Sequence, residues 1–285
     1  VGGMGLTGVI VEAQISLIPI TTTILSVEKY RLNNISSIMN KMIKNANYYK
    51  YNVAWIDYFN SDFRGVLSSA NHIENKKFSY KTNYLKYTPR SLFKVPSFFP
   101  GGLLNKFTIR VYNKILYTKN IKKIEKHIVS IDSFFFPLDT IKNWNNLYGS
   151  KGLIQYQFVV PDHSSFFIIE ALCILKKASI PVFLSVLKRF GKENQGLLSF
   201  PKAGWSLAID MPANIPNVYE TLKKLDSKLI AAGGRIYLAK DIRQSPETFN
   251  DSYQDLKKWK EIKKELDPRG VFMSDLGKRL MIHPE

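Results

Sequence analysis

The 285-residue sequence has only one cysteine, Cys173, and its four histidines are scattered. One thiol excludes a disulfide framework and gives no support to a cysteine metal cluster. No two histidines have the spacing of metal ligands on a shared face, so no metal site is expected. Cys173 lies in the apolar stretch FFIIEALCILKK and is interpreted as a core residue.

Long hydrophobic runs are also missing. No stretch approaches the ~18 consecutive apolar residues of a transmembrane helix. No secretory signal precedes the first predicted strand. The expected location is therefore cytoplasmic or peripheral at a membrane, with the periplasmic face left open.

Acidic residues are few, with 23 Asp and Glu against 41 Lys and Arg, which gives a net charge of +18. This excess favours an anionic partner: nucleic acid, a membrane surface or a phosphorylated substrate. A biased overall composition explains it equally well, because the lysines are spread over many segments. No helix-turn-helix, zinc-finger or RRM signature is present, so we expect no nucleic acid partner and leave peripheral membrane contact open.

Hydrophobic periodicity predicts an α+β fold. The most regular region has the order β-α-β-β-α-β, with segments at 152–161, 162–178, 180–191, 204–212, 217–234 and 235–241. This order is the split βαβ of ferredoxin-like sheets, an antiparallel sheet with helices on one face. The first half predicts strands at 5–20, 51–59, 64–72 and 105–119, a helix at 33–46, and a poorly ordered loop at 86–105 with three prolines.

The alternation of side chains along the predicted strands indicates what lies on the second face of this sheet. If the helices cover the aromatic and aliphatic side, the other side carries Gln155, Gln157, Lys188, Ser206 and Ala208. The pattern alone favours an ordinary solvent-facing surface. Two glutamines and a lysine beside apolar residues also suit a pocket for a hydroxylated or phosphorylated ligand.

Several long motifs carry a family resemblance. The opening VGGMGLTGVI resembles the last strand of the FAD domain in flavin oxidases of the vanillyl-alcohol oxidase group. Five further motifs are similar, in order, to the decaprenylphosphoryl-β-D-ribose 2'-oxidase family, with aldonolactone oxidases as more distant relatives: SFFFPLDTIKNWNNLYGSKGLIQYQFVVP, FLSVLKRFG, LSFPKAGWSLAIDMP, GGRIYLAKD and DPRGVFMSDLGKRL. The resemblance covers essentially the whole chain.

The resemblance implies a two-domain flavoenzyme with FAD as cofactor. Residues 1–22, as the last strand, and 235–285, as a C-terminal return, would belong to the FAD-binding domain, and 23–234 would form the substrate-binding domain. The main FAD-binding half of the family is not in the sequence. We therefore expect a fragment, a cropped chain or one half of a split enzyme, inactive when isolated.

The implied reaction oxidises the 2'-hydroxyl of a polyprenyl-phosphoryl ribose to a 2'-keto sugar, with hydride transfer to flavin N5. The implied partners are this lipid-linked phospho-sugar and a short-chain reductase that completes epimerisation to arabinose. Two alternatives stay open. One is an aldonolactone oxidase, and the other is a catalytically dead remnant or binding subunit.

Individual residues match family positions. Lys240 matches the lysine that stabilises negative charge on the reduced flavin, and is the expected catalytic residue. Tyr237 and Ile10 match flavin contacts. The matched substrate-pocket positions are Gln155, Gln157, Lys188, Val186, Phe190 and Trp55. Two positions depart from the family: Phe135 replaces a tyrosine, and Ala208 replaces the cysteine that covalent inhibitors attack.

Overall fold

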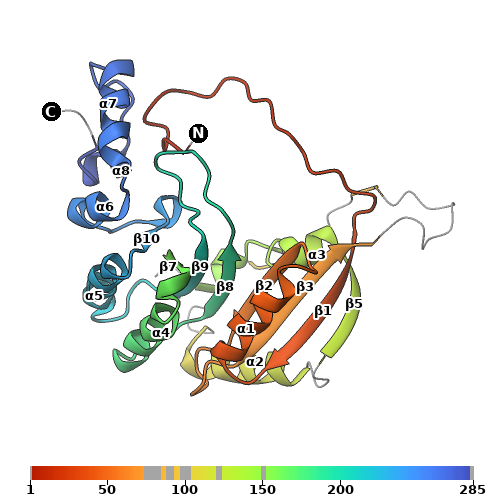
Figure 1. Ribbon diagram of the computed structural model, residues 1–285. Coiled ribbons are helices and arrows are strands. Elements are labelled where there is room, and N and C mark those ends of the chain that lie inside the picture. The colour runs from red at the N-terminus through yellow and green to blue at the C-terminus, as the bar shows by residue number, and fades with distance from the viewer. Residues whose placement is uncertain are drawn as a thin grey trace.

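The computed structural model describes residues 2–73, 85–87, 93–96, 104–119, 124–148 and 152–282. Their backbone forms one eight-stranded sheet, in which every neighbouring pair is antiparallel, and a parallel pair of two-residue strands (Figure 1). The large sheet has the strand order β10-β7-β9-β8-β2-β3-β1-β5. Most of the loop predicted at 86–105 lies outside the described residues.

The second half of the large sheet is the predicted ferredoxin-like unit. Its elements are β7 (Leu153–Pro161), α4 (Phe167–Lys177), β8 (Leu184–Phe190), β9 (Gly204–Pro212), α5 (Val218–Ala231) and β10 (Arg235–Ile236). The order β10-β7-β9-β8 places the fourth strand beside the first and the third beside the second. The α+β prediction and this unit are confirmed, although the last strand is only two residues long.

The first half repeats the same arrangement, which was not predicted from the sequence. Its elements are β1 (Ile24–Leu32), α1 (Ile35–Asn45), β2 (Tyr51–Ile56), β3 (Gly65–His72), α2 (Lys106–Lys119) and β5 (Ile124–Ser130). Read from β5, the order is again fourth, first, third, second. The sheet is therefore two β-α-β-β-α-β units joined edge to edge through β2 and β8.

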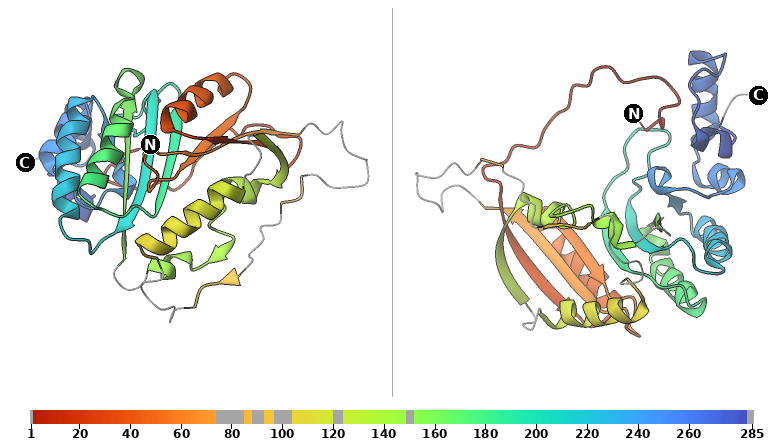
Figure 2. Two further views of the ribbon diagram at one scale, coloured as in Figure 1. Left: turned by 90° about the horizontal axis from the view of Figure 1, so that it is seen from below. Right: turned by 180° about the vertical axis from the view of Figure 1, so that it is seen from behind.

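One helix layer and one core span both units. Ile38 of α1, Leu172 of α4 and Leu225 of α5 belong to the same buried cluster as Leu67 of β3 and Leu207 of β9. The predicted covering of one face by helices is thus confirmed, and views from below and behind show these helices on that side of the sheet (Figure 2). The opposite face is left for other contacts.

The segment 105–119 was predicted as a strand, and this prediction is wrong. It forms helix α2, whose buried residues Ile109, Asn113 and Tyr117 recur every four positions. The side chain of Asn105 accepts hydrogen bonds from the backbone N–H groups of Phe107 and Thr108, at 2.9 and 3.0 Å. This is the signature of a helix N-terminus, and it outweighs the β-branched composition.

The strand predicted at 5–20 is not formed. Residues 8–20 have no regular structure, and Val11 and Leu17 are 94% and 84% exposed. A strand needs a hydrogen-bonded partner edge, and none of the described strands pairs with this segment. Figure 1 shows it as an extended arc that leads to β1.

The C-terminal region packs as a second, smaller cluster. It contains η4 (Leu238–Lys240), α6 (Pro246–Ser252), α7 (Leu256–Leu266) and α8 (Asp275–Arg279). Phe249 of α6, Trp259 of α7 and Leu280, directly after α8, share the cluster with Leu6 and Leu198. Residues near both ends of the chain therefore lie together.

Smaller elements complete the fold: β4 (Phe93–Lys94) and β6 (Ile141–Lys142), α3 (Ile131–Phe135), and the 3-10 turns η2 (Trp144–Tyr148) and η3 (Asp162–Ser164). Among the described residues, no helix combines the length and the apolar character that crossing a membrane requires.

Candidate active site

The face of the sheet opposite the helices carries most of the predicted site residues. Strand register aligns them in rows, because directly opposed residues of antiparallel strands point to the same side. One row runs across four strands through Gln157, Ala208, Val186 and Trp55. It crosses the junction between the two units. The register places Gln155, Gln157, Lys188, Ser206 and Ala208 on the face opposite the helices, as the alternation along the strands predicted.

The neighbouring rows place the other polar residues. Lys188 is opposite Ser206, and Gln155 is opposite Asp210. The side-chain amide of Gln157 donates to Ser206 Oγ at 3.2 Å, and that of Gln155 donates to Asp210 Oδ1 at 2.7 Å. Neither glutamine side-chain oxygen accepts a hydrogen bond within the described part of the chain, so each can accept one from a ligand hydroxyl.

Lys240 reaches this face from η4. The backbone N–H of Tyr237 donates to the carbonyl of Gln157 at 2.9 Å, which fixes the start of η4 against β7. Burial lowers the pKa of Lys240, and the nearby charge of Lys188 lowers it further, while Asp210 acts in the opposite direction. Lys240 Nζ donates no hydrogen bond to any described residue, and this leaves a half-buried cation available to an anionic group.

Asp210 lies on the same face, opposite Gln155, but is not among the residues predicted for the site. It is 2% exposed. Burial raises the pKa of its carboxyl, and the hydrogen bond from Gln155 and the charge of Lys240 oppose this rise. Its position in the alternation of β9, on the side of Ser206 and Ala208, was the signal available in the sequence. Asp210 is therefore a nearby counter-charge for Lys240, although no direct ion pair joins the two side chains.

Aromatic rings connect two of the predicted residues. Tyr237 stacks on Phe200 with ring centroids 4.5 Å apart, and Phe200 contacts Phe190 edge-on at 5.8 Å. Phe200 was not predicted. It lies in the irregular segment between β8 and β9, where the sequence shows no periodicity that could assign it a direction.

A cleft of about 440 Å³ opens where β2 and β8 stop pairing. The two strands are paired only at Ala54–Leu187 and Trp55–Val186. Beyond these pairs the cleft is lined from several elements, by Met42, Ala46, Tyr49, Lys50, Tyr51, Asn52, Val53, Phe134, Phe135, Lys188, Arg189, Phe190 and Gly191. It brings Phe135 next to Lys188 and Phe190 of β8, which lie more than 50 positions later in the sequence.

Phe135 enters the cleft from α3. Its ring contacts that of Tyr51 edge-on, with centroids 4.8 Å apart. Ile10, in contrast, is not brought to the site. It is 75% exposed on the extended segment before β1, and the contacts that join the other site residues do not include it.

Comparison with solved structures shows that the fold of this chain is similar to that of a portion of cholesterol oxidases. A cholesterol oxidase from B. sterolicum aligns over 90% of this chain and 60% of its own length, with a TM-score of 0.51 and 6% identity. A solvent-stable cholesterol oxidase gives a TM-score of 0.52 at 9% identity, with the same coverage. At these identities the likeness concerns the fold alone.

Sequence comparison is more specific. The D-arabinono-1,4-lactone oxidase family matches residues 177–280. Decaprenylphosphoryl-beta-D-ribose oxidase of Mycolicibacterium smegmatis is 33% identical over 296 residues, covering 99% of this chain and 62% of that protein. An uncharacterized protein in the mprA 5' region of Streptomyces coelicolor is 26% identical over 288 residues, covering 98% of this chain and 78% of that protein.

These comparisons confirm the resemblance that the motifs indicated. The chain is similar over almost its whole length to decaprenylphosphoryl-beta-D-ribose oxidase, and its residues 177–280 match the D-arabinono-1,4-lactone oxidase family. It spans 62% of the length of the mycobacterial oxidase.

Proposed function

We propose that this chain is the substrate-binding part of an FAD-linked oxidoreductase that oxidises the 2'-hydroxyl of a polyprenyl-phosphoryl ribose to the 2'-keto sugar. One observation carries the proposal, namely that a close sequence match and a set of suitable side chains occur in the same chain. The chain matches the mycobacterial oxidase over 99% of its length, and its open sheet face gathers Gln155, Gln157, Lys188 and Lys240.

The residues fit one edge of a flavin. Lys240 is a half-buried cation with free donors, which suits the ring carbonyl where negative charge develops on reduction. Tyr237, stacked on Phe200, offers an aromatic surface beside it. FAD, when bound, supplies the hydride acceptor. Ile10 would reach the ring only if the extended segment before β1 folded back toward η4.

The remaining residues would hold the sugar. The free amide oxygens of Gln155 and Gln157 can accept hydrogen bonds from ribose hydroxyls, and Lys188 can pair with the phosphate. Trp55 and Val186 lie in the same row and provide an apolar floor, which Phe190 and Phe135 extend along the cleft. These groups would bind and orient the sugar, and its orientation fixes which carbon faces the hydride acceptor.

The domain assignment is part of the proposal. Residues 1–22 and 235–285 would belong to an FAD-binding domain and 23–234 to the substrate-binding domain. The packing of Leu6 with Phe249 and Leu280 supports this grouping of the two ends. A short-chain reductase acting on the keto product would be the functional partner.

A sugar-lactone oxidase is the second candidate, because the D-arabinono-1,4-lactone oxidase family matches residues 177–280. The test compares turnover of a polyprenyl-phosphoryl ribose and of D-arabinono-1,4-lactone by the natural gene product that contains this chain, with FAD added. Faster turnover of the phospho-ribose supports the first proposal, and faster turnover of the lactone supports the second. No turnover of either, together with no flavin absorbance, supports a catalytically dead chain.

Lys240→Ala provides the matching test of the site. We expect rapid-mixing measurements to show flavin reduction slowed by about 100-fold or more, the scale for removing one preorganised charge-stabilising donor. Lys260→Ala, on helix α7, is the control and should leave the rate unchanged. An unaltered rate for Lys240→Ala would contradict the assigned role.

A further inference from the structure

Helix α2 buries one face against the protein and exposes an apolar stripe on the other. Ile109, Asn113 and Tyr117 face the protein at intervals of four residues. Phe107, Val111 and Ile115 repeat the same interval two positions earlier and are 75%, 43% and 58% exposed. Two residues correspond to about 200° around a helix, so the exposed stripe lies opposite the buried one.

The exposed side of α2 is also strongly basic. The helix sequence KFTIRVYNKILYTK has no Asp or Glu, and its cations are Lys106, Arg110, Lys114 and Lys119. Tyr112, which is 58% exposed, adds an aromatic ring with a polar tip. An exposed apolar stripe bordered by lysine and arginine is the pattern of helices that lie in the interface of a membrane.

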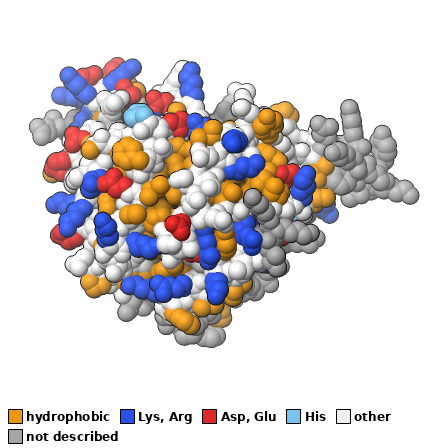
Figure 3. Space-filling view, turned by 60° about the horizontal axis from the view of Figure 1, so that its bottom comes forward, with side chains coloured by type: hydrophobic (Ala, Val, Ile, Leu, Met, Phe, Trp, Pro, Cys, Tyr) orange, Lys and Arg blue, Asp and Glu red, His pale blue; other side chains and the backbone are white. Residues whose placement is uncertain are grey.

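The helix is held firmly at one end of the molecule. The side-chain amide of Asn113 donates to Asp57 Oδ1 at 3.0 Å, just after β2, and Tyr117 OH donates to Asn33 at 2.8 Å, just after β1. In the view from below, α2 crosses the ends of these strands (Figure 2, left). The space-filling view from this side shows basic and hydrophobic side chains interleaved (Figure 3).

We propose that α2 docks this chain on an anionic lipid surface, with Phe107, Val111 and Ile115 entering the interface and the flanking cations contacting the headgroups. The positive charge of the chain and the exposed apolar stripe of α2 favour an anionic lipid surface over two other partners. A second copy of the chain would bring a net charge of +18 against +18, which opposes association through a basic face. A nucleic acid would pair with the cations but leave Phe107 and Ile115 in water.

The inference is independent of the proposed catalytic function, because it concerns a different surface. It is tested by flotation of the chain with vesicles of phosphatidylcholine mixed with phosphatidylglycerol, and with vesicles of phosphatidylcholine alone. We expect binding to the mixed vesicles that weakens as salt is raised. Phe107→Ser with Ile115→Ser should reduce the partition coefficient by at least about tenfold. Lys106→Gln with Lys114→Gln should reduce binding to the mixed vesicles only.

A matched control is available on α7, another lysine-rich helix. Leu266 is 61% exposed there, but Glu261 and Glu265 interrupt the positive charge. Leu266→Ser should leave vesicle binding unchanged. Circular dichroism and urea unfolding establish that each variant is folded. Equal flotation of the unmodified chain and of the variant with Phe107→Ser and Ile115→Ser overturns the proposal. Self-association that this variant abolishes, in the absence of any lipid binding, also overturns it.

Discussion

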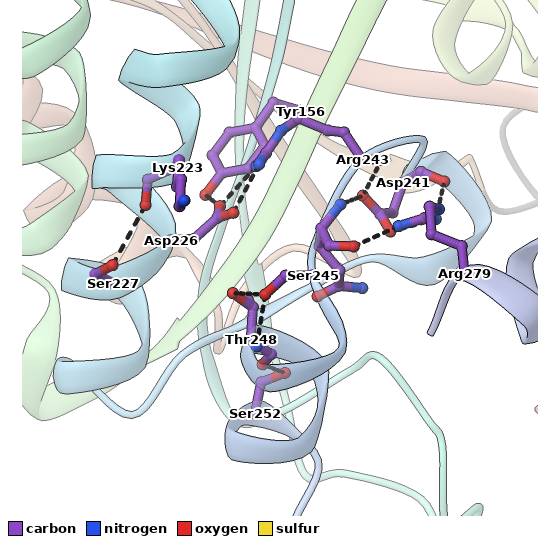
Figure 4. A network of polar contacts seen from close by, with 11 residues as sticks. Tyr156, Lys223, Asp226, Ser227, Asp241, Arg243, Ser245, Thr248, Ser252 and Arg279 are labelled. Atoms are coloured by element: carbon purple, nitrogen blue, oxygen red, sulfur yellow. Dashed lines mark hydrogen bonds and ion pairs between the residues drawn. The ribbon is translucent and has the colours of Figure 1, made fainter. Parts of the chain in front are cut away.

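The ion pair between Asp226 and Arg243 offers a quantitative test of how the C-terminal region is fastened to the sheet. Asp226 of α5 and Arg243, three residues after Lys240, have side chains that are 3% and 12% exposed. Both Nη atoms of Arg243 donate to the carboxylate at 2.7 Å, and Tyr156 OH of β7 donates to the same carboxylate at 2.9 Å (Figure 4). Three segments therefore meet at one buried carboxylate.

Arg243→Met keeps an apolar stem and removes the guanidinium. The buried carboxylate then retains Tyr156 alone, and loss of one partner of a buried pair costs about 3–5 kcal/mol in free energy of unfolding. Tyr156→Phe removes one hydrogen bond and should cost about 1 kcal/mol. Adding Asp226→Asn to Arg243→Met should recover part of the loss, because no buried charge remains. Urea unfolding followed by circular dichroism measures all four proteins.

The pH dependence of the stability of Arg243→Met gives an independent check. Burial raises the pKa of Asp226, and Arg243 opposes this rise. Without Arg243 the pKa of Asp226 in the folded state rises further above its unfolded value, so the folded variant takes up a proton more readily than the unfolded chain. Its stability deficit should therefore shrink as the pH falls through the folded pKa. A cost below about 1 kcal/mol, typical of exposed pairs, or a deficit that grows in acid, would refute the reasoning.

Three further outcomes follow from particular contacts. Asp210→Asn removes the charge that raises the pKa of Lys240, so the alkaline limb of the flavin-reduction profile should move to lower pH; a limb that stays in place argues against this electrostatic influence. Thiol-directed inhibitors of the family's pocket cysteine should leave residues 204–212 unmodified, because position 208 is alanine; peptide mass spectrometry would detect an adduct there. Gly65→Ala would place a Cβ 2.1 Å from a backbone oxygen of β2 and should cost about 1–3 kcal/mol in urea unfolding, while Gly191→Ala, with open space around it, serves as the neutral control.

In the second unit, local periodicity was sufficient to predict which side of each long strand faces the core. The two-residue alternation of β7, β8 and β9 separated the core side from the open side, and the register confirms Gln155, Gln157 and Lys188 on the open face. Register is strongly determined when one face is buried. The sequence therefore contained most of the candidate site before any three-dimensional information.

Elsewhere, local pattern was insufficient for physical reasons. The residues of α2 are rich in β-branched and aromatic side chains, and its helical state depends on the cap at Asn105 and on burial of every fourth residue. The opposite error concerns residues 8–20. Their composition is typical of a strand, but none of the described strands pairs with them. Strand propensity expresses fit to a neighbouring strand rather than a property of the segment alone.

The junction of the two units explains why the cleft could not be predicted. Of the residues that line the cleft, Val53 belongs to the first unit, Lys188 to the second, and Phe135 to the helix that follows the edge strand β5. Only the order of strands in the folded sheet places them together, since no periodicity links positions so far apart. Because two residue pairs are all that join β2 to β8, the strand ends are free to separate, and this separation creates space for a ligand. The same short junction makes the cleft sensitive to small shifts between the units, so substitutions in β2 or β3 that leave Lys188 and Lys240 untouched should still alter substrate binding.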